Sequence, residues 1–257
     1  MRAVISKAEI ESTIAARFGD AFKHHEIKRP EVIASGIPEI DALAGGGLPR
    51  GAITEIFGSA SSGRTSFMLS TLAMATNHDE VCALVDMNNT LDPESAGSAI
   101  VNFDRLLWIR CDNNLEHAFK ATDLLLQGGG FGIVMLDLGD LSAKAARRII
   151  SSWWFRFRRV VENTPTALLV ITQDCSVRSC AALSLEMKNE AVVWSQVNPD
   201  LTKKKNFSLV NLSTRVKTTA PFLVSHGKLL RSLTILLERH RPLSPTVRET
   251  TLQVSAQ

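Results

Sequence analysis

The 257 residues are 45% hydrophobic and 21% charged, which is typical of a globular protein and excludes a disordered chain. No run of 18 apolar residues is present and the N-terminus lacks the apolar core of a secretory signal, so we expect a cytoplasmic protein without a membrane-spanning helix. The four cysteines have no CxxC spacing and favour neither a zinc site nor a disulfide framework.

Charge is distributed unevenly along the chain. From Lys203 onward, ten Lys and Arg residues stand against two acids, which gives +8, and the first 202 residues therefore carry −5 of the net +3. A basic C-terminal segment on an acidic body suggests an anionic partner, either nucleic acid or an acidic protein surface. A solvated tail that keeps the protein soluble explains the same asymmetry equally well.

The first predicted element is a short helix over residues 7–18. Ser6 with Glu9 has the form of a capping box, and Gly19 can end the helix. The apolar stripe of this helix can pack on its own core or dock on a neighbouring molecule. Its residues are Ile10, Ile14 and Phe18.

Strands and helices alternate through the rest of the chain. This alternation implies right-handed crossovers and a mostly parallel sheet flanked by helices, which is an α/β fold. Beyond Ser244 we expect disorder. The predicted strands are 52–57, 81–85, 106–109, 132–136, 167–172, 183–193 and 207–217, and the predicted helices are 66–74, 116–127 and 144–163.

A glycine-rich segment joins the first of these strands to a helix. It fits the pattern GxxxxGK[ST], except that Arg64 stands where Lys is expected. In such a loop, backbone N–H groups face phosphate oxygens at a helix N-terminus, where the helix dipole also favours an anion. Thr65 and Asp137 are the expected Mg²⁺ residues. The expected nucleotide-binding residues of the loop are Gly58, Ser59, Ala60, Ser61, Ser62, Gly63, Arg64, Thr65 and Ser66.

Arg64 keeps the positive charge of the usual Lys. Its planar guanidinium is bulkier than an ammonium group and places its donors differently. We therefore expect weak nucleotide binding and inefficient handling of a γ-phosphate.

Five segments resemble the bacterial RecA family over residues 32–222. They are GIPEIDALAGGGLPRGAITEIFGSASSGRTS, DMNNTLDP, IVMLDL, ITQ and RVKTTAPF. The resemblance implies a RecA-like P-loop core, ATP with Mg²⁺ as cofactor, and Gln173 as the residue that senses the nucleotide. It divides the chain into an N-terminal helix and linker (1–31), the core (32–222) and a basic C-terminal segment (223–257).

The details are most similar to the ImuA-type RecA paralogues. Members of that family accompany ImuB, a Y-family-polymerase-like protein, in damage-induced (SOS) mutagenesis. The resemblance implies contact with RecA through the helix at 7–18 and contact with an ImuB-type protein. The basic C-terminal segment is the expected site for any single-stranded DNA.

The sequence departs from RecA in four separate parts of the motor. Asn88 stands at the position of the catalytic Glu, and an amide cannot act as a general base. Only 35 residues separate Asp137 from Gln173, and the predicted helix and strand leave no room there for the first DNA-binding loop. The second DNA-binding loop is also short. The segment RVKTTAPF lacks the lysine-bearing insertion by which RecA reads ATP across the subunit interface.

These departures predict a non-recombinase with a degenerate ATP site and no catalytic residue. The resemblance to ImuA-type paralogues implies an accessory role in translesion synthesis. The alternative is an ATP-dependent recombinase or DNA-repair ATPase of the RecA family. Such an enzyme would have to tolerate Arg64 and use another carboxylate, such as Asp92 or Glu94.

The predicted helix at 144–163 carries one aromatic residue away from its core face. Phe155 lies beside Arg156 and Arg159, and an exposed aromatic among arginines suits partner contact or base stacking. Ordinary exposure is the alternative, and Arg178 is a weaker candidate for a phosphate contact. The expected core residues of this helix are Ile149, Ile150, Trp153, Trp154, Phe157, Val160 and Val161.

Overall fold

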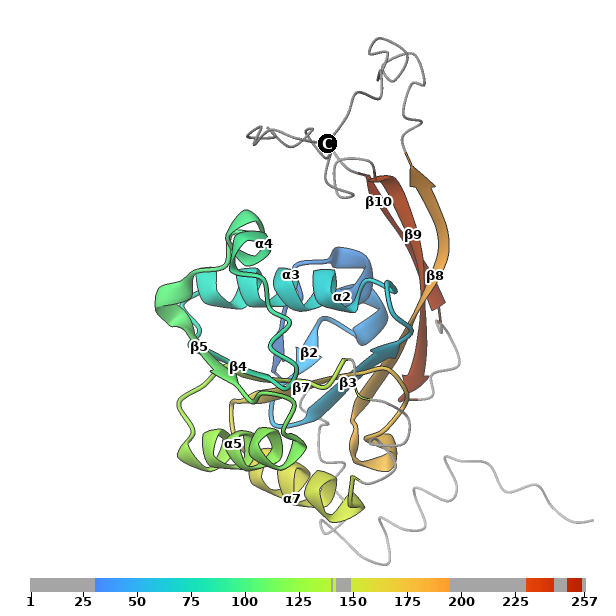
Figure 1. Ribbon diagram of the computed structural model, residues 1–257. Coiled ribbons are helices and arrows are strands. Elements are labelled where there is room, and N and C mark those ends of the chain that lie inside the picture. Colours follow the sequence, from blue (N-terminus) through green and yellow to red (C-terminus); the bar gives the residue numbers. More distant parts are fainter. Residues whose placement is uncertain (1–30, 140, 142–148, 195–229, 243–248, 256–257) are drawn as a thin grey trace, which may run out of the picture. The chain divides into compact units, whose positions relative to one another are not determined.

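The computed structural model describes residues 31–139, 141, 149–194, 230–242 and 249–255. The chain divides between Glu31 and Val32, and the architecture below is that of the second unit. Its centre is an eight-stranded sheet in the order β10-β9-β8-β3-β7-β6-β4-β5 (Figure 1). The predicted helix at 7–18, with Ile10, Ile14 and Phe18, lies outside the described residues, as does the predicted strand at 207–217.

Most of the sheet is parallel, as the sequence predicts. The pairs from β8 through β3, β7, β6 and β4 to β5 all run parallel, whereas β9 pairs antiparallel with β8 and β10. This confirms the mostly parallel α/β core. The strands are β3 (Ile53–Gly58), β4 (Cys82–Asp86), β5 (Leu106–Arg110), β6 (Ile133–Asp137), β7 (Ala167–Thr172), β8 (Leu183–Trp194), β9 (Leu230–Arg241) and β10 (Glu249–Ser255).

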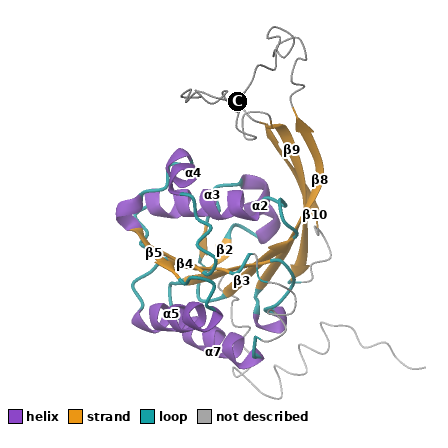
Figure 2. Ribbon diagram, in the orientation of Figure 1, coloured by secondary structure: helices purple, strands orange, loops and turns teal. Residues whose placement is uncertain are grey.

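Helices cover both faces of the sheet (Figure 2). One apolar core lies under α2 (Pro38–Ala44), α3 (Arg64–Asn77) and α4 (Pro93–Ser98). A second lies under α5 (Leu115–Gly128) and α7 (Ser151–Val161). Successive strand residues alternate between the two cores, as Leu84 and Val85 do, because side chains of a strand point to opposite faces. The smaller elements are β1 (Val32–Ile33), β2 (Leu48–Pro49), η2 (Phe103–Arg105) and η3 (Arg178–Cys180).

The helix predicted at 144–163 is shorter than expected at its start. Ile150 precedes the first turn with extended backbone angles (φ −72°, ψ 125°), so α7 begins at Ser151. The assignment of Ile150 to the core is wrong, because its side chain is 66% exposed. Residues 140 and 142–148, between β6 and α7, lie outside the described residues, so the absence of a first DNA-binding loop stays a prediction.

The expected disorder beyond Ser244 is wrong for Glu249–Ser255, which forms β10. Leu230–Arg241, in the same segment 223–257, forms β9, which lies within the sheet between β8 and β10. The physical reason is apolar alternation: Ile235, Leu237 and Leu252 are buried in the core under α2 and α3. The basic charge of this segment concealed that pattern.

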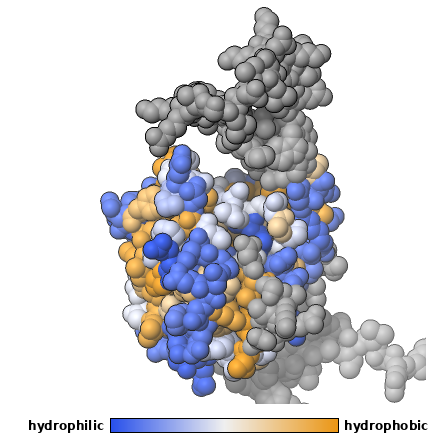
Figure 3. Space-filling view, in the orientation of Figure 1, coloured by the Kyte–Doolittle hydropathy of each residue, from blue (hydrophilic) through white to orange (hydrophobic). Residues whose placement is uncertain are grey.

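No helix among the described residues is long and apolar enough to cross a membrane. On the face drawn in Figure 3, hydrophobic areas are interrupted by hydrophilic ones.

Candidate functional site

The glycine-rich loop joins β3 to α3 at the carboxyl edge of the parallel strands. Gly63 is the N-cap of α3, with a left-handed backbone (φ 94°), and Arg64 is the first residue of the helix. Ser61 is also left-handed (φ 61°). The first backbone N–H groups of α3 have no partner inside the helix, so this end can bind an anion.

Both glycines of the motif are also required by packing. A Cβ atom on Gly58 would overlap the backbone oxygen of Met187 on β8. A Cβ on Gly63 would overlap the side chain of Ile235 on β9, in addition to the strain of its left-handed backbone. The two glycines thus have a structural role whether or not a phosphate binds.

The remaining loop side chains divide into exposed and buried ones. Ser59, Ala60, Ser61, Thr65 and Ser66 are exposed. Ser62 is 1% exposed, and its hydroxyl has no hydrogen-bond partner among the described residues.

Arg64 is directed to the carboxyl ends of β6 and β7. Arg64 is buried, with 8% of its surface exposed. Nη1 donates to the backbone oxygen of Thr172 at 2.7 Å and to that of Gly139 at 3.0 Å.

Thr65 and Asp137 lie together, as the motif predicts, but Arg64 lies beside them. The three residues line one small cavity of about 80 Å³, with Thr90 and Gly139. Asp137 Oδ1 already accepts a hydrogen bond from the Gly139 N–H at 2.8 Å. Gln173 directly follows β7 at the same edge of the sheet and is exposed.

Asn88 is tied to a neighbouring loop. Its side-chain amide donates to Asn113 Oδ1 at 2.7 Å. The buried carboxylate of Asp86 shapes the segment by accepting from the N–H groups of Thr90 and Leu91, each at 3.0 Å. The amide of Asn88 is therefore held in place and offers no general base.

The alternative carboxylate Asp92 is also engaged. It is the N-cap of α4 and accepts from the N–H groups of Glu94 and Ser95. The hydrogen bond from the Ser95 hydroxyl, at 2.5 Å, is the main cause that lowers the pKa of Asp92 below its ordinary value. Glu94 is exposed in the first turn of the same helix.

Sequence reasoning missed Glu55, which lies in the middle of β3 and is completely buried. Its Oε1 accepts from the N–H groups of Ser176 (2.6 Å) and Val177 (2.7 Å). Its Oε2 accepts from the Ser184 hydroxyl at 3.2 Å and the Cys175 thiol at 3.4 Å. A lone acid in an apolar strand was the available signal, because a buried carboxylate needs such partners.

Phe155 is exposed, as predicted, with 56% of its surface accessible. It lines a cleft of about 660 Å³ with Arg178 and the segment that Glu55 holds. Arg156 pairs with Asp123 through two hydrogen bonds of 2.6 Å each, and its contact with a partner stays a prediction. These bonds raise the pKa of Arg156 above its ordinary value. Arg156 therefore bridges α7 to α5, and its charge is largely compensated.

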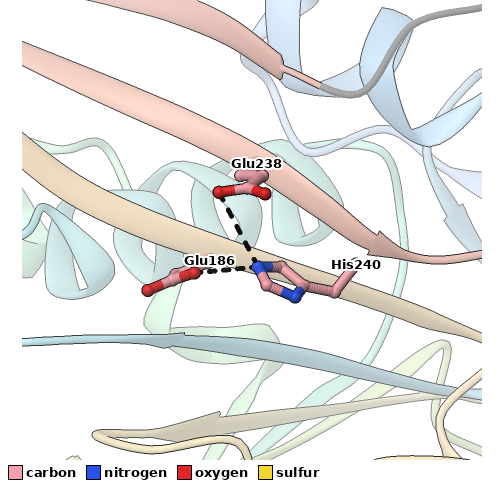
Figure 4. Close-up of side chains that lie close together, drawn as sticks. All are labelled: Glu186, Glu238 and His240. Atoms are coloured by element: carbon pink, nitrogen blue, oxygen red, sulfur yellow. Dashed lines mark hydrogen bonds and ion pairs between the residues drawn. The ribbon is translucent and has the colours of Figure 1, made fainter.

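A cluster of charged side chains lies on the paired strands β8 and β9 (Figure 4). His240 Nε2 lies 2.8 Å from Glu186 Oε2 and 4.0 Å from Glu238 Oε2. Lys188 Nζ lies 2.8 Å from Glu238 and 3.1 Å from Glu186, and these contacts raise the Lys188 pKa. The two glutamates are directly opposite in the strand register, where like charges repel. The ion pairs of Lys188 with both glutamates offset this repulsion.

The chain is similar to known proteins over its first half and beyond. The profile of the RecA N-terminal domain family matches residues 7–148. The protein RecA of Pseudomonas putida is 33% identical over 172 residues, which cover 61% of this chain and 47% of the relative. RecA of Pseudomonas fluorescens strain SBW25 is 32% identical with the same coverage. The chain thus spans about half the length of the curated relatives it matches.

Proposed function

Since this chain belongs to the RecA family, we propose that it is an accessory RecA paralogue that keeps the phosphate loop but does not work as a recombinase. The site geometry supports this function. The phosphate loop has the strand, loop and helix of an anion-binding site, but its cationic side chain is held by backbone oxygens of Thr172 and Gly139. A side chain so anchored is poorly placed to follow a transferring phosphoryl group.

The lack of a carboxylate at Asn88 supports the same conclusion. ATP hydrolysis requires a group that orients the attacking water, and the Asn88 amide already donates to Asn113. The alternative function, an ATP-dependent recombinase, would need Asp92 or Glu94 in that role. Asp92 caps α4, which argues against its use.

The more specific part of the proposal is that this protein acts together with a Y-family-polymerase-like protein of the ImuB type. The support is the resemblance to ImuA-type paralogues in translesion synthesis. In this proposal the stripe of Ile10, Ile14 and Phe18 contacts RecA, and ATP binds weakly. Single-stranded DNA would meet basic residues of the C-terminal segment, although Arg239 of that segment already donates to the Leu43 backbone oxygen.

ATP turnover tests the non-recombinase proposal. We expect hydrolysis at least about 10²-fold slower than that of the Pseudomonas putida RecA, with or without single-stranded DNA, because a positioned base is missing. Asn88→Glu is the matched variant, and it should recover part of the difference only if Arg64 also becomes Lys. DNA-stimulated turnover equal to that of RecA would favour the recombinase alternative.

The contact with RecA has a separate test. A carboxylate in an apolar contact costs free energy, so Ile14→Asp should remove any effect of this protein on RecA filaments. Electron micrographs of RecA filaments with wild type, with Ile14→Asp and with the polar-face control Glu11→Ala give the answer. Filaments of equal length in all three samples would contradict contact through this stripe.

A further inference from the structure

We propose that Arg64 takes the place of the divalent cation in the phosphate loop, so that the loop binds nucleotide phosphates without Mg²⁺. This inference rests on the proposed function, in which the phosphate loop binds a nucleotide. It adds which group supplies the positive charge at the phosphates. The resemblance implied ATP with Mg²⁺ at Thr65 and Asp137. The residues around these two do not fit a hydrated Mg²⁺.

The guanidinium of Arg64 is fixed by three elements. Arg64 begins α3, while its Nη1 donates to the last residue of β7, Thr172, at 2.7 Å. The same atom donates to Gly139, which follows β6, at 3.0 Å. With the residue 8% exposed, the positive charge is held at one place and is poorly screened by water.

That place is beside the residues that would hold the metal. A Cβ atom built on Gly139 would lie 3.0 Å from Asp137 Oδ1 and 3.4 Å from Arg64 Nη1, so the carboxylate and the guanidinium flank the same point. Arg64, Thr65 and Asp137 also line the same cavity of about 80 Å³. Mg²⁺ demands near-octahedral oxygen ligands and keeps several of its waters. A hydrated dication here would meet a fixed positive charge at short range.

Arginine suits the role of a resident cation better than lysine would. It remains charged at every accessible pH, and its planar donors pair well with phosphate oxygens. The N-terminus of α3 adds its own attraction for an anion. Arg64 keeps the positive charge of the usual Lys, but it places that charge beside Thr65 and Asp137, where the motif expects the metal ion.

The test measures the dissociation constant of a fluorescent ADP analogue for the full chain, in Mg²⁺ and in EDTA. ADP is used because its binding does not depend on turnover. For wild type we expect the two constants to agree within about twofold, whereas for Arg64→Lys Mg²⁺ should tighten binding about tenfold. Arg64→Gln should weaken binding in EDTA by about tenfold or more, because the resident charge is gone. Thermal melts of each variant check that it is folded.

The wild-type comparison decides the matter even if a variant fails to fold. Tightening of wild-type binding by Mg²⁺ of about tenfold, or no binding in EDTA, would overturn the inference. Neither result touches the non-recombinase proposal, which is tested by DNA-stimulated turnover. Metal-independent binding together with RecA-like turnover would instead uphold the inference and remove the proposed function.

Discussion

At the scale of single residues, Glu55 fixes the backbone segment that follows β7. Its carboxylate accepts from the N–H groups of Ser176 and Val177. Glu55→Ala leaves these donors unpaired in the core, and each unpaired buried donor costs about 1–3 kcal/mol. We expect a loss of about 2–5 kcal/mol in the free energy of unfolding, measured by urea titration.

The control for this prediction is Glu94→Ala. Glu94 is exposed, and such surface changes usually stay within about 0.5 kcal/mol. An equal effect of the two substitutions would show that Glu55 does not anchor the segment after β7.

Cys175 donates to the same carboxylate, and its surroundings lower the reactivity of its thiol. Burial of its sulfur, followed by the nearby charge of Glu55, raises the pKa of this thiol to about 11. The thiolate is the reactive form, so alkylation by iodoacetamide at pH 8 should be about 100-fold slower than for an ordinary thiol. A pH series followed by mass spectrometry should give a rate midpoint near pH 11, and a midpoint near 9 would contradict this environment for Cys175. Unfolding in urea is the control, because it should restore ordinary reactivity.

At the scale of elements, β9 and the phosphate loop are packed on each other. Ile235 is 2% exposed and lies against Gly63 at the start of α3. Ile235→Ala should cost about 2–5 kcal/mol of stability, because it leaves a cavity. The same variant should weaken ADP binding, because the phosphate loop loses the side chain that packs against Gly63. The measurements are urea unfolding and the ADP titration.

Leu124→Ala is the matched control for Ile235→Ala, because Leu124 is 70% exposed on α5. We expect Leu124→Ala to change neither the stability nor the affinity for ADP noticeably. A stable Ile235→Ala protein with unchanged ADP binding would mean that the loop keeps its shape without β9.

The parts of the fold that could be predicted are those with long apolar periodicity. Strands β3 to β8 and the helices α3 and α5 were predicted close to their observed bounds. The short helices α2 and α4 were missed, because each relies on Pro at its start and on few buried side chains rather than on periodicity. Strand β9 was missed because the charged residues toward its two ends resemble a solvated segment, although Ile235 and Leu237 between them are buried.

The motif predicted which residues of the candidate site lie near one another, but not the groups that they contact. The motif placed Arg64, Thr65 and Asp137 together, and they do line one cavity. The backbone oxygens that hold Arg64 come from Thr172 and Gly139, far along the chain. A backbone carbonyl carries no sequence signal, so these contacts could not have been predicted from residue types.

At the scale of the whole molecule, the strands β9 and β10 of the basic C-terminal segment belong to the central sheet. Deleting residues 223–257 would remove β9 and β10 and leave β8 with an open edge and exposed apolar side chains. We expect this deletion to abolish cooperative thermal unfolding, which circular dichroism would measure. Deletion of residues 256–257 alone is the control. A cooperative transition in the long deletion would show that the two strands are dispensable, and only then could the deletion report on DNA binding.

The position of β3 in the sheet also has a consequence for how the protein is made. Its hydrogen-bonded neighbours β7 and β8 are encoded more than a hundred residues after it. During translation, β3 and its buried carboxylate therefore leave the ribosome long before the strands that pair with them exist. Such distant pairing slows folding and leaves apolar strands exposed to aggregation, so this nascent chain needs protection over that interval. The stretch that carries the phosphate loop is made early and folds late.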